Sequence, residues 1–246
     1  MTTAFDLGLD GLRAADGTST EVAEALHDEF ELLVRHDIGT SRSYVLAFDS
    51  AATWGLPGAE NLAAFDVVRH PEQQTFRLRR SYHAVMAFAQ KWLIERGCPP
   101  EALRLDPFLP ADESSYLLEE RIYGSGDRYE IRSGFAMDGG DARAWTMVVD
   151  REAAELPVRL FVEDLERFDL SYTLREGAFP DEDTALEWCR LEPGPLPPAP
   201  EDREMAAERT RAALARSTAS AALGTAPVSA VPASGVAAQS DRGRSL

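Results

Sequence analysis

The residues best suited to acid–base chemistry are Tyr82 and His83, which are neighbours in the sequence and follow Arg79 and Arg80. Positive charge close to a histidine favours its neutral form, and a neutral imidazole can act as a general base. The alternative is a histidine on a helix surface that pairs with a carboxylate. We favour this structural interpretation, so His83 and Tyr82 are candidates for catalysis but not an assigned catalytic pair.

The run Arg77-Leu78-Arg79-Arg80 is the one basic cluster in an acidic chain. Its guanidinium groups could hold a phosphate or carboxylate ligand, or dock an acidic partner. They could equally pair with an acidic N-terminal helix of the same chain, and we favour that internal pairing. Trp54 precedes a glycine in a segment of loop composition, so we expect this tryptophan to be an exposed contact residue.

Other motifs that would indicate chemistry are absent or weak. The sequence has no phosphate-binding loop, no dinucleotide-binding glycine pattern and no nucleophile elbow. The four histidines lack metal-ligand spacing, and we predict neither a metal nor a cofactor. We expect neither Cys98 nor Cys189 to be a nucleophile. The acidic runs Glu119-Glu120 and 181–183 could serve glycosidic chemistry, but we interpret them as a solvated strand edge and a helix start.

A long helix over 72–96 would position the arginine, tyrosine and histidine candidates. Proline and glycine signals mark its two ends, and apolar residues recur between them at helical spacing. These apolar residues are Leu78, Tyr82, Val85, Met86, Ala89, Trp92 and Leu93. Two further helices are expected at 19–36 and 181–191. The spacing therefore predicts that the long helix is central to the fold.

Alternating apolar and polar residues predict strands in the second half of the chain. Their expected positions are 117–123, 129–135, 145–149, 157–162 and 168–174. Short turns between consecutive strands favour antiparallel pairing. Another strand is expected at 43–48, followed by a loop over 49–70. The predicted fold class is α+β: an antiparallel β-meander of about five strands packed against the long central helix, with additional N- and C-terminal helices and a disordered C-terminal tail.

Composition divides the chain into four parts. Residues 1–192 are expected to form a single α+β domain, and 193–200 a proline-rich linker. Residues 201–216 could form a polar helix. Residues 217–246 are rich in alanine, serine and glycine and lack aromatic side chains, so we expect them to be a disordered tail. No internal repeat is recognised in the sequence.

The chain has 246 residues and a formal net charge of −17. An acidic surface repels nucleic-acid phosphates and anionic lipid head groups, so neither nucleic acid nor membrane is an expected partner. No apolar run approaches the roughly 20 residues of a membrane helix, and the N-terminus lacks a secretory signal. With two cysteines, a cytoplasmic location with reduced thiols is the simplest expectation. Frequent alanine and a single lysine, Lys91, indicate a GC-rich bacterial genome.

Two classes of function remain after these exclusions. The first is a non-enzymatic accessory or regulatory protein that acts through a protein partner, which the acidity and the lack of catalytic motifs favour. The alternative is an enzyme or small-molecule-binding protein with a pocket between the sheet and the long helix. That pocket would use Tyr82, His83 and Arg79 or Arg80. Catalytic groups need only meet in space, so enzymatic activity stays open, although we favour the non-enzymatic interpretation.

Overall fold

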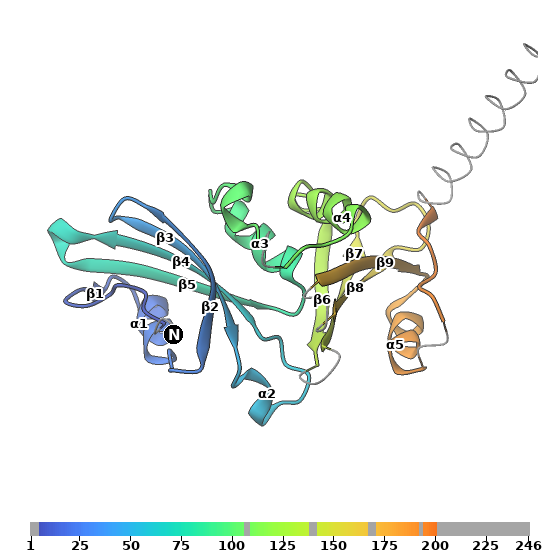
Figure 1. The fold of residues 1–246 in the computed structure, drawn as a ribbon, viewed down its shortest axis with the longest axis horizontal. Helices are drawn as coiled ribbons and strands as arrows, with labels where there is room; N and C mark the ends of the chain where they lie inside the picture. The colour runs from blue at the N-terminus through green and yellow to red at the C-terminus, as the bar shows by residue number, and fades with distance from the viewer. Residues whose placement is uncertain (1–4, 106–108, 138–141, 167–170, 192–193, 201–246) are drawn as a thin grey trace, which may run out of the picture. The chain divides into compact units, whose positions relative to one another are not determined.

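The computed structural model describes residues 5–105, 109–137, 142–166, 171–191 and 194–200. This part of the chain contains two sheets with mainly antiparallel pairing and five α-helices (Figure 1). The first sheet has the order β1-β5-β4-β3-β2, with β1 (Arg13–Ala14), β2 (Phe30–Ile38), β3 (Arg42–Asp49), β4 (Leu62–His70) and β5 (Thr75–His83). The second has the order β6-β7-β8-β9, with β6 (Tyr129–Ala136), β7 (Ala142–Asp150), β8 (Val158–Glu166) and β9 (Ser171–Phe179). The helices are α1 (Gly17–Glu24), α2 (Ala52–Gly55), α3 (Met86–Ile94), α4 (Glu113–Tyr123) and α5 (Glu182–Leu191).

The α+β class is confirmed, but the strands form two mainly antiparallel sheets instead of the predicted single meander of about five strands. In the second sheet each strand pairs in antiparallel fashion with the next one along the chain. These four strands correspond to the predicted strands at 129–135, 145–149, 157–162 and 168–174, although 168–170 lie outside the described residues. The predicted strand at 43–48 and the predicted helix at 181–191 are also present, as β3 and α5.

The predicted long helix over 72–96 is wrong. Its first part is strand β5, and only Met86–Ile94 forms a helix, α3. Within β5, buried Phe76 and Leu78 alternate with exposed Arg77, which is the period of a strand. The spacing of four residues from Leu78 to Tyr82 is even, so it fits one face of a strand as well as one face of a helix. The apolar stripe therefore could not separate the two structures.

Three other predicted elements differ from the structure. The predicted helix at 19–36 is divided between α1 and β2, and the predicted loop over 49–70 contains α2 and β4. β4 is buried along almost its whole length, so it lacks the alternation of a strand with one solvated face. The predicted strand at 117–123 belongs to α4, which begins where the Asp112 carboxylate accepts a hydrogen bond from the Ser115 amide.

The described chain contains an internal structural repeat, contrary to the sequence analysis. Both halves contain a helix, four antiparallel strands and a second helix: α1, β2–β5 and α3 in the first, α4, β6–β9 and α5 in the second. The first half also has the short helix α2 between β3 and β4. Four elements of the second half begin 96 residues after their counterparts. The paired first residues are Gly17 and Glu113, Leu62 and Val158, Thr75 and Ser171, and Met86 and Glu182. The two halves are called the first and second repeat below.

The same hydrogen-bonded clamp joins helix to strand in each repeat. In the first repeat Asp16 accepts hydrogen bonds from the Ser19 amide (2.8 Å) and the Arg79 guanidinium (2.9 Å), and Ser19 Oγ accepts one from the Leu78 amide (3.0 Å). The second repeat makes the corresponding bonds with Asp112, Ser115, Leu174 and Arg175. In both repeats 59 residues separate the serine from the leucine that it holds. The clamp supports a common origin for the two halves.

Helix α3 lies between the cores of the two repeats. Met86, Ala89 and Leu93 pack on the first sheet, on the face opposite α1, while Ala87 and Phe88 join the core of the second sheet and α4 (Figure 1). Seven of its nine residues are buried, as expected of a helix that is apolar on nearly all sides. A short helix thus takes the central place predicted for a long one.

Residues 194–200, which the sequence analysis interprets as a linker, lie against the second sheet. The Ala178 amide of β9 donates a hydrogen bond to the Pro197 carbonyl (2.9 Å), and Leu196 packs on the core beneath α5. The described residues up to Pro200 belong to one compact unit. The division into domain, linker, polar helix and tail stays a prediction, since 201–246 lie outside the described residues.

Candidate functional site

A groove of about 530 Å³ lies between the two repeats, and we call it the inter-repeat groove. Its walls are mostly apolar. The first repeat contributes Leu33, Phe48, Leu62 and Met86, the connection between repeats contributes Leu105 and Leu109, and the second repeat contributes Met137, Ala144 and Leu165. A concave apolar surface with a few polar groups is the usual form of a ligand site. The duplication of the fold therefore creates the main candidate site in the described part of the chain.

One wall of the groove is formed by β2, the last strand of the first sheet. β2 pairs with β3 on one side and with no described strand on the other. Leu32 and Leu33 are 38% and 37% exposed on this strand. An exposed strand edge carries free amide and carbonyl groups that can pair with another chain. This wall therefore offers both apolar side chains and backbone hydrogen-bonding groups.

Glu163 of β8 is a titratable group among the residues that line the groove. Its Oε2 accepts a hydrogen bond from the Met86 amide at the start of α3 (3.0 Å). Burial raises the pKa of this carboxyl to about 7, and the charge of Glu119 adds to the effect. A carboxyl that titrates near neutrality can exchange a proton or pair with a cation. The sequence analysis missed Glu163 because its predicted strand ended at 162. The residue could have been found as an acidic side chain between Phe161 and Leu165 on one face of a longer strand.

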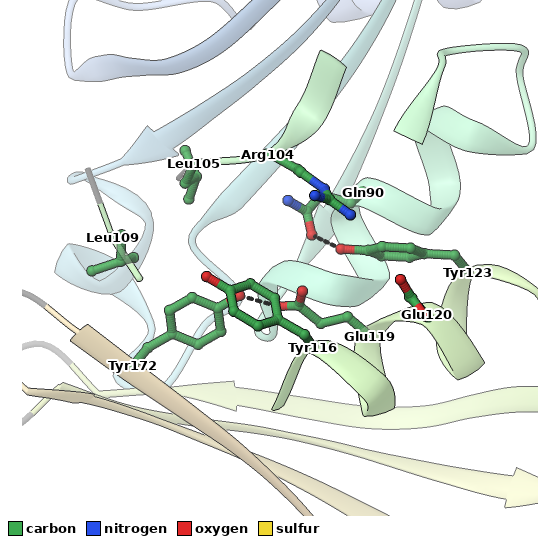
Figure 2. Close-up of a pocket in the computed structure, with 9 residues that line it drawn as sticks. All are labelled: Gln90, Arg104, Leu105, Leu109, Tyr116, Glu119, Glu120, Tyr123 and Tyr172. Atoms are coloured by element: carbon green, nitrogen blue, oxygen red, sulfur yellow. Dashed lines mark hydrogen bonds between the residues drawn. The ribbon is translucent and has the colours of Figure 1, made fainter. Parts of the chain in front are cut away.

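A second buried carboxyl, Glu119, lies behind the Leu105 and Leu109 wall of the groove. It lines a small cavity of about 30 Å³ with Gln90, Arg104 and three tyrosines (Figure 2). Burial raises its pKa, and a hydrogen bond from the Tyr172 hydroxyl opposes that shift. The predicted strand edge at Glu119-Glu120 is wrong, because both residues lie on helix α4, where Glu119 is buried and Glu120 is exposed.

The tyrosines around Glu119 form part of a fixed hydrogen-bond network. Figure 2 shows the Tyr123 hydroxyl directed at the Gln90 side chain, to which it donates a hydrogen bond of 2.6 Å. Gln90 in turn donates to the Leu103 carbonyl (2.8 Å). Burial raises the pKa of both Tyr123 and Tyr172, so these phenols stay protonated at neutral pH. The network holds Glu119 in place and leaves Glu163 as the carboxyl that the groove presents.

The structure separates the two predicted catalytic candidates. Tyr82 and His83 are successive residues of a strand, so their side chains point to opposite faces of the first sheet. Tyr82 lines another cavity, of about 590 Å³, and its hydroxyl donates a hydrogen bond to Asp49 (2.8 Å). Burial and this carboxylate raise the pKa of Tyr82 to about 12. Tyr82 therefore stays protonated and acts as a hydrogen-bond donor.

His83 is buried, and its Nε2 has no hydrogen-bond partner among the described residues. Burial lowers the pKa of His83 to about 4, with smaller contributions from Arg96 and Lys91. The imidazole is therefore neutral, as the sequence analysis argued. The cause is burial and charges on and beside α3 rather than Arg79 and Arg80.

The predicted binding arginines do not form one site. Arg79 pairs with Asp16 in the clamp, Arg80 lies over the Tyr82 ring (4.8 Å to the centroid), and Arg77 is exposed. Trp54 lies in α2 and is 73% exposed. None of the four lines the inter-repeat groove.

The remaining sequence candidates take structural places. Cys98 is buried, and burial raises the pKa of its thiol to about 12. Asp181 accepts a hydrogen bond from the Thr184 amide (2.8 Å) at the start of α5, as expected for a helix start.

The described residues include no group of three or more histidine, cysteine or acidic side chains placed to hold a metal ion. In the same part of the chain, no helix is long and apolar enough to span a bilayer.

The chain was compared with protein-family models, with curated proteins and with solved structures. It matches none of them.

Proposed function

We propose that the protein is a non-enzymatic accessory or regulatory protein that binds an extended, apolar and basic segment of a partner protein in the inter-repeat groove. The observation that carries the proposal is the combination of an apolar groove with the free edge of β2 along one wall. A peptide that adds to such an edge gains main-chain hydrogen bonds, while alternate side chains enter the pockets beside it. Leu33 and Phe48 would contact those side chains.

Charge supports a basic partner. The chain carries a net charge of −17, and Glu31 and Glu163 both line the groove. Arg143, the basic residue among the described lining residues, pairs with Asp164. Complementary charge accelerates association and excludes acidic competitors. The same charge argues against nucleic acid as the partner, and a chain with only two cysteines fits a cytoplasmic bacterial location.

Selection from a displayed library of random peptides, with the full chain immobilised, tests the proposal. We expect enriched peptides with apolar residues at alternate positions and at least one lysine or arginine. Leu33→Asp and Met137→Asp should weaken the binding of these peptides more than tenfold, because each places a charge on the groove wall. Ile38→Asp is the matched control: Ile38 is 45% exposed on the same strand but outside the groove, so binding should be unchanged.

Two outcomes would contradict the proposal. Selected peptides that bind all three variants as tightly as the unmodified chain would place the binding surface elsewhere. A concentration-dependent dimer that Leu33→Asp abolishes would assign the groove to a second copy of this chain. Sedimentation velocity over a range of protein concentrations separates this dimer from a monomer.

A second candidate function is small-molecule binding or catalysis in the same groove, because Glu163 titrates near neutrality in apolar surroundings. This candidate replaces the predicted pocket built from Tyr82, His83 and Arg79 or Arg80, which the fold does not bring together. Thermal shift assays with octylamine and octanol distinguish the two functions. Strong stabilisation by octylamine alone, together with failure of the peptide selection, would favour a small cationic ligand.

A further inference from the structure

We infer that Glu163 selects a positively charged side chain, lysine or arginine, at one position of the segment bound in the inter-repeat groove. This inference rests on the proposed function and adds the residue that determines specificity. It starts from a carboxylate among the mostly apolar residues that line the groove. A charged group in such a position needs a partner of opposite charge when a ligand excludes water from it.

The hydrogen bonding of Glu163 leaves one oxygen available. Oε2 is held by the Met86 amide, while Oε1 has no hydrogen-bond partner among the described residues. The bond to Met86 fixes the carboxylate at the start of α3, where the helix dipole favours negative charge. The free oxygen is therefore held in a defined place on the groove wall.

No described basic side chain neutralises Glu163. Arg143 lines the same groove, but it forms an ion pair with Asp164. The charged groups that act on the Glu163 carboxyl are Glu119 and Asp164, and both are acidic. A cation from a bound segment would supply the missing countercharge, and a charge-assisted hydrogen bond to the free oxygen would fix its position.

Two fluorescein-labelled, end-blocked nonapeptides of alternating valine and serine test the inference. One carries a central lysine and the other a central Nε-acetyl-lysine, in which an acetyl group on the lysine amine removes its charge. Affinities are measured by fluorescence anisotropy with the full chain at pH 8, where Glu163 is ionised. We expect the lysine peptide to bind about tenfold more tightly, which is the effect of one charge-assisted hydrogen bond.

Variants assign this preference to a single residue. Glu163→Gln should remove the tenfold preference while the acetyl-lysine peptide binds within twofold of its affinity for the unmodified chain. Glutamine keeps an acceptor for the Met86 amide, so circular dichroism should show an unchanged fold. Glu187→Gln is the matched control: Glu187 is exposed on α5 and does not line the groove, so it should change either affinity by less than twofold.

The outcomes separate the two levels of the account. If both peptides bind the unmodified chain equally, this inference is overturned while the proposed function stands. If Glu187→Gln abolishes the preference and Glu163→Gln does not, the selecting residue is wrong. If neither peptide binds and the display selection also fails, the proposed function and this inference fall together.

Discussion

At the scale of single residues, burial moves the pKa of two titratable groups in opposite directions. His83 is a base, so burial favours its neutral form and lowers its pKa to about 4. Glu163 is an acid, so burial favours its protonated form and raises its pKa to about 7. Only Glu163 lines the inter-repeat groove. His83 is therefore a structural histidine in this account, and Glu163 is the functional group.

The stability of the protein should report the buried His83 directly. The unfolded chain takes up a proton on this residue below pH 6.5, whereas the folded chain resists protonation until about pH 4. The free energy of unfolding should therefore fall as the pH drops through this window. His83→Phe removes the titrating group. The corresponding position of the second repeat, at the end of β9, already holds a phenylalanine, Phe179. From pH 7 to pH 5 the unmodified chain should lose about 2 kcal/mol more than the variant in urea unfolding. Equal losses would show that His83 is accessible to protons.

Glu163→Gln should stabilise the protein at high pH. The folded pKa of about 7 lies above the ordinary value of 4.5, so the folded chain binds more protons between these values and loses stability as the pH rises. Glutamine carries no charge and avoids this loss. In urea unfolding, the variant should be about 3 kcal/mol more stable than the unmodified chain at pH 8 and indistinguishable from it at pH 4.5. A variant less stable at both pH values would show that the carboxylate serves the fold instead of binding.

The candidate residues show why sequence alone located chemistry only in part. Tyr82 and His83 are conspicuous as adjacent polar groups in an apolar stretch, but adjacency on a strand separates their side chains. Glu163 and Glu119 lie 44 positions apart in the numbering and come close only through the packing of α4 on the second sheet. The chain has 42 acidic residues, and nothing in the sequence shows that Glu163 is a buried one until the buried face of its strand is known.

At the scale of elements, the Asp–Ser–Arg clamp repeats because it solves one local problem twice. Each clamp caps a helix start and holds a leucine amide of β5 or β9, each of which pairs with a described strand on one side only at that point. Ser19 and Ser115 are fully buried, whereas the arginines of the clamp are 41% and 43% exposed. The serines should therefore carry most of the stabilisation.

Ser19→Ala and Ser115→Ala should each lower the free energy of unfolding by about 2 kcal/mol, because each leaves a buried leucine amide unpaired. Arg79→Gln and Arg175→Gln remove partly exposed ion pairs together with hydrogen bonds to the clamp serine and the leucine carbonyl, and leave the buried leucine amide paired, so each should cost less than about 1 kcal/mol. Chemical denaturation of the four variants measures these differences. Arginine variants that cost more than the serine variants would contradict the account of the clamp.

The elements of the second repeat could be predicted more accurately than those of the first. α4 covers one face of its four-stranded sheet and α5 covers the other, and its strands keep a visible alternation of apolar and polar residues. In the first repeat, helices α1 and α3 bury both faces of the sheet, so β4 reads as a continuous apolar run and β5 as part of a helical stripe. The repeat could not be recognised in the sequence, because the two halves share an Asp-x-x-Ser pattern and a distant Leu-Arg pair but few other identical residues.

At the scale of the whole described unit, duplication supplies what one repeat lacks. Each repeat alone offers a sheet with helices, but the groove needs walls from both. α3 belongs to the first repeat and also packs on the core of the second. Its first residue, Met86, is therefore held beside Glu163, whose carboxylate accepts a hydrogen bond from the Met86 amide. The acidic charge of the chain then favours basic partners. Partner binding between repeats is the central claim of this account.

Photo-cross-linking tests that claim most directly. A lysine-containing peptide from the display selection, carrying a diazirine on one apolar side chain, is bound to the full chain, irradiated and mapped by mass spectrometry. The account predicts cross-links on residues of both repeats that line the groove, such as Leu33 and Met137, and their loss with excess unlabelled peptide. Cross-links confined to the exposed Trp54 segment, or to the outer faces of either sheet, would contradict it.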